Sequence, residues 1–428
     1  MNSPPRHVVI IGNGITGVST ALRLRERLPD CRITMISGES TYPWSRPALM
    51  YVFMGHMRYQ DTKPWEDRTW REKRIDLVRD WVVEIEAGER RVVLHRNAPI
   101  EYDELVLALG SKPNKFGWPG QDLDGVQGMY DLMDLERLYR TCERTKTAVV
   151  VGGGLIGIEL GEMLHSRGIH VDFLVREPSY WSNVLPAEES RMVNRIIERE
   201  GFGLHLETNL KAIVDDGGGR VGGVETAEGP RFECQLVGLT AGVSANIDLV
   251  KGSSIETGRG VLVDDGFRTS APHVWAAGDC AEIRARDGGR NLIQQVWYTG
   301  KRQGALLADA LAGDDVHYDP GIWYNSAKFL HLEYQTYGDV NRNVPGEQSL
   351  YWEHDDGLHA LRLVHVEGRV IGVNLMGIRY RHRKCEEWIR DRRSVEWVLE
   401  HLDEGNFDPE FAPRHEARIR RTLLEAAR

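Results

Sequence analysis

Short apolar runs alternate with amphipathic stretches over most of the chain. The apolar run at 8–11 and the strand-like stretch at 32–36, which contains Arg32 and Thr34, flank the stretch 15–28, in which apolar residues recur at helical spacing. The same strand–helix–strand pattern returns at 147–175. Uninterrupted apolar runs of this length are typical of strands that are buried on both faces. The pattern therefore predicts two α/β units, each with a parallel sheet that helices cover.

Other segments carry the signals of shorter strands. Residues 77–95 alternate apolar and polar positions around Gly88, which predicts an antiparallel hairpin. Residues 204–239 predict short strands joined by glycine turns. Two further buried strands are expected within 102–110 and 274–279, and each ends at a glycine.

The pattern changes from residue 320 onwards. A helix is predicted at 297–311, and after it aromatic residues become more frequent. Period-two runs such as 361–366 then indicate strands, and the end of the chain from about residue 384 is helical and highly charged. We therefore expect a C-terminal α+β domain at 320–428 with a charged helical tail.

Composition excludes several classes of partner. The net charge of the 428 residues is −10, spread without a long acidic block, whereas nucleic-acid binding requires a basic surface. No apolar run approaches the about 18–20 residues that cross a bilayer. The N-terminus has no signal-peptide pattern and leads straight into the first strand. We therefore expect a cytoplasmic protein that binds neither nucleic acid nor a membrane.

The cysteines and histidines show no local metal or disulfide pattern. None of the five cysteines forms C-x-x-C, and the 15 histidines contain no H-x-x-x-H or H-E-x-x-H pair. No metal site, disulfide framework or local dithiol centre is expected.

Two glycine-rich turns follow the first strand of each repeated pattern. One is G-x-G-x-x-G at 12–17, and the other is G-G-G-L-I-G at 152–157. Such glycines let the diphosphate of a dinucleotide approach a helix N-terminus. Glu39 stands where the second strand ends, so its carboxylate is placed to accept ribose hydroxyls. The sequence thus predicts two dinucleotide sites.

Four motifs in this order resemble the two-dinucleotide-binding flavoproteins of the pyridine nucleotide–disulfide oxidoreductase superfamily, over roughly 7–340. The first turn with Glu39 resembles the FAD-adenosine site, and the second turn resembles the NAD(P)H site. The segment 108–113 resembles A-T-G-x-x-P, with Leu109 in place of Thr, and 277–279 resembles the motif whose Asp holds the flavin ribityl chain. The resemblance implies a glutathione-reductase-like fold with two Rossmann-like domains plus the C-terminal domain.

Further motifs are similar to the ferredoxin/rubredoxin reductase branch. Residues 43–51 resemble P-Y-x-R-P-P-L-S-K, residues 297–304 resemble W-x-x-A-x-x-Q-G, and residues 323–326 resemble P-W-F-W-S. The resemblance implies a discontinuous FAD-binding domain at 1–111 and 236–319, and an NAD(P)H-binding domain at 112–235.

The resemblance also implies roles for individual residues. In the family, a Glu at the position of Glu159 lies near the flavin and the nicotinamide, paired with a Lys where this chain has Tyr51. Trp297 would lie beside the isoalloxazine. These three residues are the candidate catalytic residues. The expected cofactor-binding residues are Gly12, Gly14, Ile15, Thr16, Gly17, Glu39, Ser40, Arg46, Pro47, Val83, Ala108, Leu109, Gly110, Gly152, Gly154, Leu155, Ile156, Gly157, Arg176, Glu177, Gly242, Gly278, Asp279, Val296 and Trp297.

Several of these roles have a structural alternative. Arg46 would pair with the FAD diphosphate, shield the flavin edge, or form a purely structural ion pair. Asp279 would accept a ribityl hydroxyl or cap a helix, and Trp297 would contact flavin or fill the core. At the second site, Arg176 after a Val favours NADPH because Arg can pair with a 2′-phosphate, whereas Glu177 opposes a phosphate. The sequence leaves both NADPH and NADH as candidates for the nucleotide of the second site.

The expected function follows from a missing cysteine. Residues 40–55 contain none, which excludes the thiolate relay that disulfide reductases place there. We expect an enzyme that passes electrons from NAD(P)H through FAD to a redox protein such as ferredoxin or rubredoxin. The alternatives are direct reduction of O₂ or a quinone, and an apoptosis-inducing-factor-like binding module. The basic stretch at 379–384 is either a docking patch or a solvated helix face, and the aromatic residues from 323 to 337 fill the core, cover the flavin or form a homodimer interface.

Overall fold

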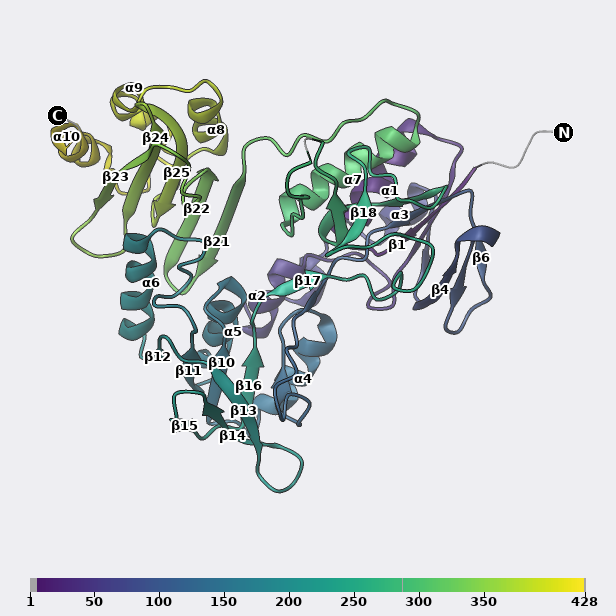
Figure 1. Ribbon diagram of the computed structural model, residues 1–428, viewed down its shortest axis with the longest axis horizontal. Helices are drawn as coiled ribbons and strands as arrows, with labels where there is room; N and C mark the ends of the chain where they lie inside the picture. The colour runs from purple at the N-terminus through teal and green to yellow at the C-terminus, as the bar shows by residue number, and fades with distance from the viewer. Residues whose placement is uncertain (1–5, 287, 427–428) are drawn as a thin grey trace. The chain divides into compact units, whose positions relative to one another are not determined.

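The computed structural model describes residues 6–286 and 288–426, which form two compact units (Figure 1). The first unit contains the described residues up to Asn114, Gly128–Arg140 and the described part of Gly242–Asp319. The second contains Lys115–Gln127, Thr141–Ala241 and the described residues from Pro320 onwards. The first five residues, where the absence of a signal peptide was expected, lie outside the described residues. None of the described helices is long and apolar enough to cross a membrane.

A five-stranded parallel sheet forms the centre of the first unit. Its order is β19-β7-β1-β2-β3, with bounds β1 His7–Ile11, β2 Arg32–Ile36, β3 Ile75–Val78, β7 Glu104–Leu107 and β19 Val274–Ala276. Ile10 is aligned with Met35 on one side and Val106 on the other, and all three are buried. The β–α–β pattern predicted from the apolar runs is confirmed, because strands buried on both faces need apolar side chains at every position.

Helices α1 (Ile15–Arg27) and α7 (Trp297–Leu311) pack side by side in this unit (Figure 1). A Cβ added to Gly304 would lie only 2.3 Å from the backbone oxygen of Thr16, so the two backbones touch at this point. The Thr20 hydroxyl donates to the Gly304 carbonyl oxygen at 3.0 Å. This contact fixes the middle of α7 against the start of α1. The helix predicted at 297–311 is therefore confirmed.

Smaller elements complete the first unit. An antiparallel sheet of β4, β5 and β6 contains the predicted hairpin around Gly88. The remaining elements are β4 Val82–Glu86, β5 Arg91–Leu94, β6 Ile100–Glu101, β8 Ser111–Pro113, β17 Val243–Ala245, β18 Val261–Val263, β20 Ala281–Ile283, α2 Leu49–Phe53, α3 Arg68–Glu72 and, across the boundary between the two units, α4 Leu132–Cys142.

The second unit has a similar parallel sheet, of order β12-β11-β10-β16-β9. The bounds are β9 Val126–Gln127, β10 Thr147–Val151, β11 His170–Leu174, β12 Gly203–His205, β16 Leu236–Leu239, α5 Leu155–His165 and α6 Ala187–Arg199. Beside it, β13 Leu210–Asp215, β14 Val221–Thr226 and β15 Arg231–Phe232 form the antiparallel strands expected around the glycine turns.

The C-terminal segment forms an antiparallel sheet with helices, as predicted for an α+β domain (Figure 1). Its strands, in the order β21-β22-β25-β24-β23, and its helices are β21 Tyr324–Phe329, β22 Leu332–Gly338, β23 Glu347–Glu353, β24 Ala360–Val366, β25 Arg369–Met376, α8 His382–Arg390, α9 Val395–Glu400 and α10 Glu416–Ala426. Its core includes Trp352, Tyr380 and Trp388, so aromatic side chains fill the space between sheet and helices. Phe329, Tyr334 and Tyr337 are also buried, which agrees with the core alternative for the aromatic residues that follow residue 320.

A buried ion pair joins this sheet to α6. Arg362 on β24 donates from Nε to Glu189 Oε1 at 2.8 Å, and from Nη2 to Glu188 Oε2 at 2.6 Å. The Arg362 and Glu189 side chains are 7% and 1% exposed. The contact helps to place the C-terminal segment in one compact unit with 141–241. The division into FAD, NAD(P)H and interface domains stays a prediction.

Removing one partner of this pair is expected to destabilise the fold. Arg362→Ala leaves the Glu189 carboxylate buried without its main counter-charge, which costs about 3–5 kcal/mol. The exposed Arg342→Ala variant is the matched control and should change stability little. Thermal unfolding monitored by circular dichroism measures both. Equal midpoints for the two variants would show that the buried pair contributes no more than a surface pair.

Candidate functional site

The first glycine turn joins β1 to α1 by backbone contact. Gly12 has φ +112°, and a Cβ on it would lie 2.1 Å from the Ala108 backbone oxygen. A Cβ on Gly17 would lie 2.0 Å from the Gly12 oxygen. Gly14 is different, because a Cβ there would meet nothing within 4 Å. The outer glycines close the turn, and the middle one leaves an open cradle above it.

The second turn, between β10 and α5, has the same construction. Gly152 has φ +126°, and its Cβ would lie 2.6 Å from the Thr240 oxygen. A Cβ on Gly157 would lie 2.8 Å from the Gly152 oxygen, whereas one on Gly154 would again meet nothing within 4 Å. The turns at 12–17 and 152–157 are far apart in the sequence and thus have the same backbone geometry. Each fits the diphosphate of a dinucleotide.

The helices that follow the turns begin without a side-chain cap. Among the residues that the structure describes, no side chain caps α1 at Gly14 or α5 at Gly154. The N–H groups of a first helical turn have no acceptor inside the helix. These are the groups of Ile15, Thr16 and Gly17 in α1, and of Leu155 and Ile156 in α5, where the Gly157 N–H donates instead to the Gly154 carbonyl oxygen at 3.1 Å. Together with the helix dipole they suit a bound anion.

The end of β2 holds the residues expected around the FAD adenosine. The Asn13 side chain donates to the Ser40 carbonyl oxygen at 2.9 Å and so ties this segment to the glycine turn. Glu39 Oε2 accepts from Arg46 Nη2 at 2.8 Å, and Glu39 Oε1 accepts from the Leu132 N–H at 3.1 Å. The structural ion pair that we considered for Arg46 is therefore present. Contacts of Glu39 and Arg46 with FAD stay predictions.

A chain of contacts leads from Arg46 to Asp279, first by cation–π stacking and then by hydrogen bonds. The Arg46 guanidinium lies over the Tyr130 ring at 4.6 Å, and the Tyr130 hydroxyl accepts from the Ser111 N–H at 3.0 Å. Ser111 Oγ donates to Asp279 Oδ2 at 3.0 Å and accepts from Gln295 Nε2 at 2.8 Å. Burial raises the pKa of Asp279, so one more donor, such as a ribityl hydroxyl, would stabilise its charged form.

Sequence reasoning missed three members of this chain. Ser111 stands inside the motif at 108–113, so its position in the motif was an available signal. Tyr130 and Gln295 reach the site from distant segments, and no local pattern marks them. Asp279 does not cap its helix, because the short 3₁₀ helix Gly278–Cys280 has Ala277 as its N-cap.

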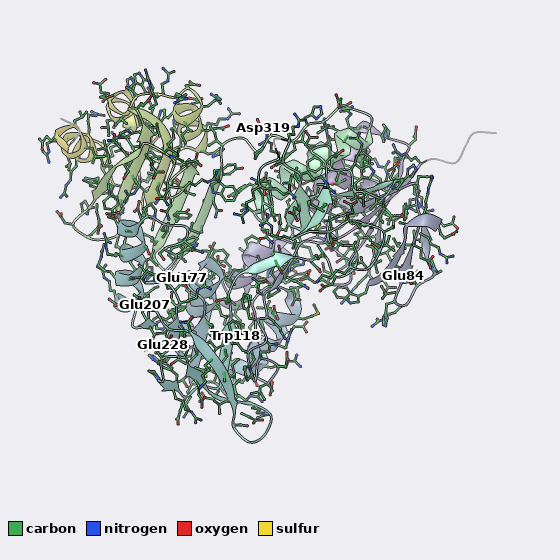
Figure 2. The ribbon with its side chains drawn as sticks, in the orientation of Figure 1. Glu84, Trp118, Glu177, Glu207, Glu228 and Asp319 are labelled. Atoms are coloured by element: carbon green, nitrogen blue, oxygen red, sulfur yellow. The ribbon has the colours of Figure 1, made fainter. Side chains whose placement is uncertain are left out.

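The other predicted FAD residues lie in the same unit. Pro47 is part of the 3₁₀ helix Arg46–Ala48. The Gly242 carbonyl oxygen accepts from the Asn114 N–H at 3.1 Å, and the Gly110 oxygen accepts from the Asn246 N–H at 2.9 Å. The remaining residues are Leu109, which follows β7; Val83, which is exposed on β4 beside Glu84 (Figure 2); and Val296, which is the N-cap of α7.

The candidate catalytic residues fall in both units. Trp297 begins α7 and is only partly buried, so it does not fill the core in the way that we considered as an alternative. Tyr51 lies on α2 in the first unit, with its ring 6.2 Å from that of His56. Glu159 lies on α5 in the second unit. The proximity of Glu159 to flavin and nicotinamide stays a prediction.

The carboxyl group of Glu159 has a strongly raised pKa. Burial, reinforced by the nearby Glu162 carboxylate, raises its pKa to about 8. The neutral form of this carboxyl group is therefore favoured at pH 7.

The residues expected to select the nucleotide lie just beyond β11. Val175 is fully buried, and a Cβ on Gly153 would lie 2.6 Å from it. The Arg176 guanidinium is largely exposed and pairs with Glu177 Oε1 at 2.8 Å. Glu207 lies beside this segment (Figure 2), and its N–H donates to the Glu177 carbonyl oxygen at 3.2 Å. Arg176 is thus near enough to offset the charge that Glu177 presents.

All five cysteines lie among the described residues, and all are free. Cys280 follows Asp279 directly, but burial raises the pKa of its thiol to about 12. Burial also raises the pKa of Cys142 to about 11 and that of Cys234 to about 12. A thiolate is the reactive form of cysteine, and the raised pKa values favour the less reactive thiol form at neutral pH.

The family described as pyridine nucleotide-disulphide oxidoreductase matches residues 6–304, which include both glycine turns. The chain belongs to this family. The family membership and the fold class that the sequence predicted are both confirmed. The prediction of an oxidoreductase that uses FAD with NADPH or NADH is confirmed at the level of the class.

Individual relatives are similar at moderate identity. The chain is 27% identical over 375 residues to nitrite reductase [NAD(P)H] of Bacillus subtilis, covering 87% of this chain and 46% of that protein. It is 27% identical to the ferredoxin–NAD(+) reductase component of the biphenyl dioxygenase system of Paraburkholderia xenovorans, covering 72% of this chain and 75% of that one. A ferredoxin reductase structure from Rhodopseudomonas palustris superposes with TM-score 0.79 at 26% identity, covering 87% and 91%. The chain spans about half the length of the first curated relatives that it matches.

Substitutions of the two open glycines should separate the two sites. Gly14→Val points its side chain into the first cradle, where a Cβ meets nothing within 4 Å, so the chain should fold but retain at least about tenfold less FAD, which corresponds to 1.4 kcal/mol. Gly154→Val should keep FAD and lose reduction by NAD(P)H. Flavin absorbance after purification and after nucleotide addition measures both effects. Full FAD content in Gly14→Val would contradict the assignment of the first turn.

The shifted titration of Glu159 predicts a pH dependence of stability. Its folded pKa of about 8 lies above the model value of 4.5, so the native state keeps a proton that the unfolded state releases. Stability should therefore fall as pH rises from about 5 to 8, by at most about 1.4 kcal/mol per pH unit from this group. Denaturant unfolding of Glu159→Gln should lack this component, whereas the exposed control Glu198→Gln should keep it. A wild-type profile in Glu159→Gln would refute the assignment.

Proposed function

We propose that this protein is an NAD(P)H-dependent flavoprotein reductase that passes electrons from NAD(P)H through FAD to a redox protein such as ferredoxin or rubredoxin. The observation that carries the proposal is the pair of glycine turns, each with an open middle glycine at an uncapped helix N-terminus. One turn would hold FAD, and the other would hold the nicotinamide dinucleotide.

The residues around the first site would hold and orient the flavin. The α1 N-terminus would bind the diphosphate, Glu39 the adenosine ribose, and Asp279 the ribityl chain. The start of α7 has no side-chain cap among the described residues, so its N–H groups and dipole would stabilise negative charge on reduced flavin. When bound, FAD would supply hydride acceptance from nicotinamide and release of electrons to the acceptor.

Electrons would leave the flavin without a thiol relay. The segment 40–55 has no cysteine, and the buried Cys280 is held as a thiol. Reduction of a disulfide at this site would need a reactive thiolate. This supports an external acceptor as the electron sink.

The name of the Paraburkholderia relative supports a ferredoxin as that acceptor. The basic stretch at 379–384 does not by itself favour such docking. The Arg379 guanidinium pairs with Glu333, and Lys384 pairs with Glu387 at 3.1 Å and with Glu404 at 3.2 Å. Direct reduction of O₂ or a quinone, and a slowly turning-over binding module, therefore stay as alternatives. We also propose a cytoplasmic location, which the free cysteines fit.

An anaerobic titration tests the proposal. NADPH and NADH are added separately, and bleaching of the flavin absorbance is recorded. Arg176→Ala should weaken reduction by NADPH more than reduction by NADH if Arg176 pairs with a 2′-phosphate. Rapid reduction followed by cytochrome c reduction that requires added ferredoxin is the expected result. Rapid turnover with O₂ or a quinone alone would favour the small-acceptor alternative, and a persistent charge-transfer band with little turnover would favour the binding module.

A further inference from the structure

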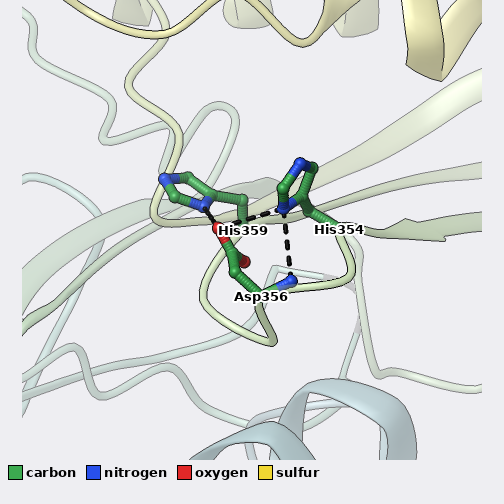
Figure 3. Close-up of side chains that lie close together, drawn as sticks. All are labelled: His354, Asp356 and His359. Carbon is green, nitrogen blue, oxygen red and sulfur yellow. Dashed lines mark hydrogen bonds and ion pairs between the residues drawn. The ribbon is translucent and has the colours of Figure 1, made fainter.

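A group of metal-ligating side chains lies far along the chain from the glycine turns, in the hairpin between β23 and β24. His354 directly follows β23, and His359 directly precedes β24. The His354 N–H donates to the His359 carbonyl oxygen at 2.8 Å, which closes the loop. Asp356 stands between them. Figure 3 shows that the three side chains converge on one point.

The ligand atoms of this group are close to one another. Asp356 Oδ2 lies 3.0 Å from His354 Nδ1 and 2.8 Å from His359 Nδ1. The edge between two ligands in a tetrahedral zinc site is about 3.3 Å, since zinc lies about 2.0–2.1 Å from N and O ligands. Small side-chain movements would therefore admit a metal ion.

The loop backbone orients the carboxylate. The Leu358 N–H donates to Asp356 Oδ1 at 2.8 Å, and Oδ2 lies next to the two imidazoles. The neighbouring Asp355 does not join the group, because it pairs with Arg418 at 2.7 Å.

His354 Nδ1 faces two groups with opposite requirements. It accepts from the Asp356 N–H at 3.3 Å, and it also faces the Asp356 Oδ2 lone pairs at 3.0 Å. A neutral imidazole that accepts from the N–H presents a lone pair to a carboxylate oxygen. A cation between the nitrogen and the oxygen removes this repulsion.

A fourth imidazole lies next to the group. The His415 ring, just before α10, lies 4.7 Å from the His359 ring and 5.1 Å from the His354 ring. Its Nε2 is buried and has no hydrogen-bond partner among the described residues. An imidazole nitrogen without a hydrogen-bond partner has a lone pair that can bind a metal ion.

Space and charge around the imidazoles are compatible with an ion. His359 and His415 both line a small cavity of about 30 Å³. Arg379 also lines this cavity, but its charge is matched by Glu333, whose Oε2 accepts from Arg379 Nε at 2.9 Å.

We propose that His354, Asp356 and His359 form a binding site for a divalent transition metal, with His415 as the fourth ligand. Imidazole nitrogens with one carboxylate select zinc and similar ions over magnesium and calcium, which prefer oxygen ligands. The bound ion ties the β23–β24 hairpin to the start of α10. This site is independent of the proposed reductase function, and it differs from our expectation that the chain has no metal site.

Zinc binding to the full flavin-loaded chain without a histidine tag tests the proposal. The protein is dialysed against about 10 µM free zinc, and bound metal is measured by mass spectrometry. One zinc per chain is expected in the wild type and in the control His331→Ala, whose side chain is 76% exposed. The double variant H354A/H359A and the near-isosteric D356N should bind at least about tenfold more weakly. His415→Ala should bind more weakly than the wild type and more tightly than the double variant.

Stability supplies a second measurement. Zinc should raise the thermal midpoint of the wild type and of His331→Ala, and it should raise that of D356N by less. Flavin absorbance and circular dichroism verify that each variant is folded. Absence of zinc from the wild type, or equal binding by D356N, would overturn the site. Unchanged affinity in His415→Ala would overturn its assignment as the fourth ligand.

Discussion

The structure depends on the close approach of backbone to backbone at two strand–helix turns. At each turn the outer glycines touch a neighbouring backbone oxygen, at distances where no side chain fits, and the middle glycine faces open space. The contact lets the helix begin directly above the strand end, so its unsatisfied N–H groups converge on that space. Gly304 of α7 extends the same principle, because a Cβ on it would lie 2.3 Å from the Thr16 backbone oxygen of α1.

Polar side-chain contacts make the sites at the two backbone turns different from each other. In the first unit, Glu39, Arg46, Tyr130, Ser111 and Asp279 form a chain of ion pairing, stacking and hydrogen bonding that connects the end of β2 with the end of β19. In the second unit, the raised pKa of Glu159 and the paired Arg176 and Glu177 give the other turn a different electrostatic character. One backbone geometry thus serves two sites whose side chains differ.

Local patterns allowed the sequence to predict most of the fold. The apolar runs of β1 and β10, the glycine turns and α7 are each encoded by neighbouring residues, so periodicity and turn chemistry suffice. Contacts between distant segments were not predictable in this way. Arg362 and Glu189 are 173 residues apart, and Ser111 and Asp279 are 168 apart. The histidine group was missed because its two loop histidines have a hairpin spacing rather than a helical one, and His415 reaches them from another element.

In the proposed function, the electron path inside this chain ends at a single flavin. A reductive titration of the FAD-loaded protein under anaerobic conditions, followed to complete loss of the oxidised flavin absorbance, tests it most directly. One equivalent of NAD(P)H, which carries two electrons, is expected to reduce each chain fully, because the thiols of Cys142, Cys234 and Cys280 are free and held protonated. A requirement for two equivalents per chain would show a second redox centre, such as a disulfide, and would contradict it.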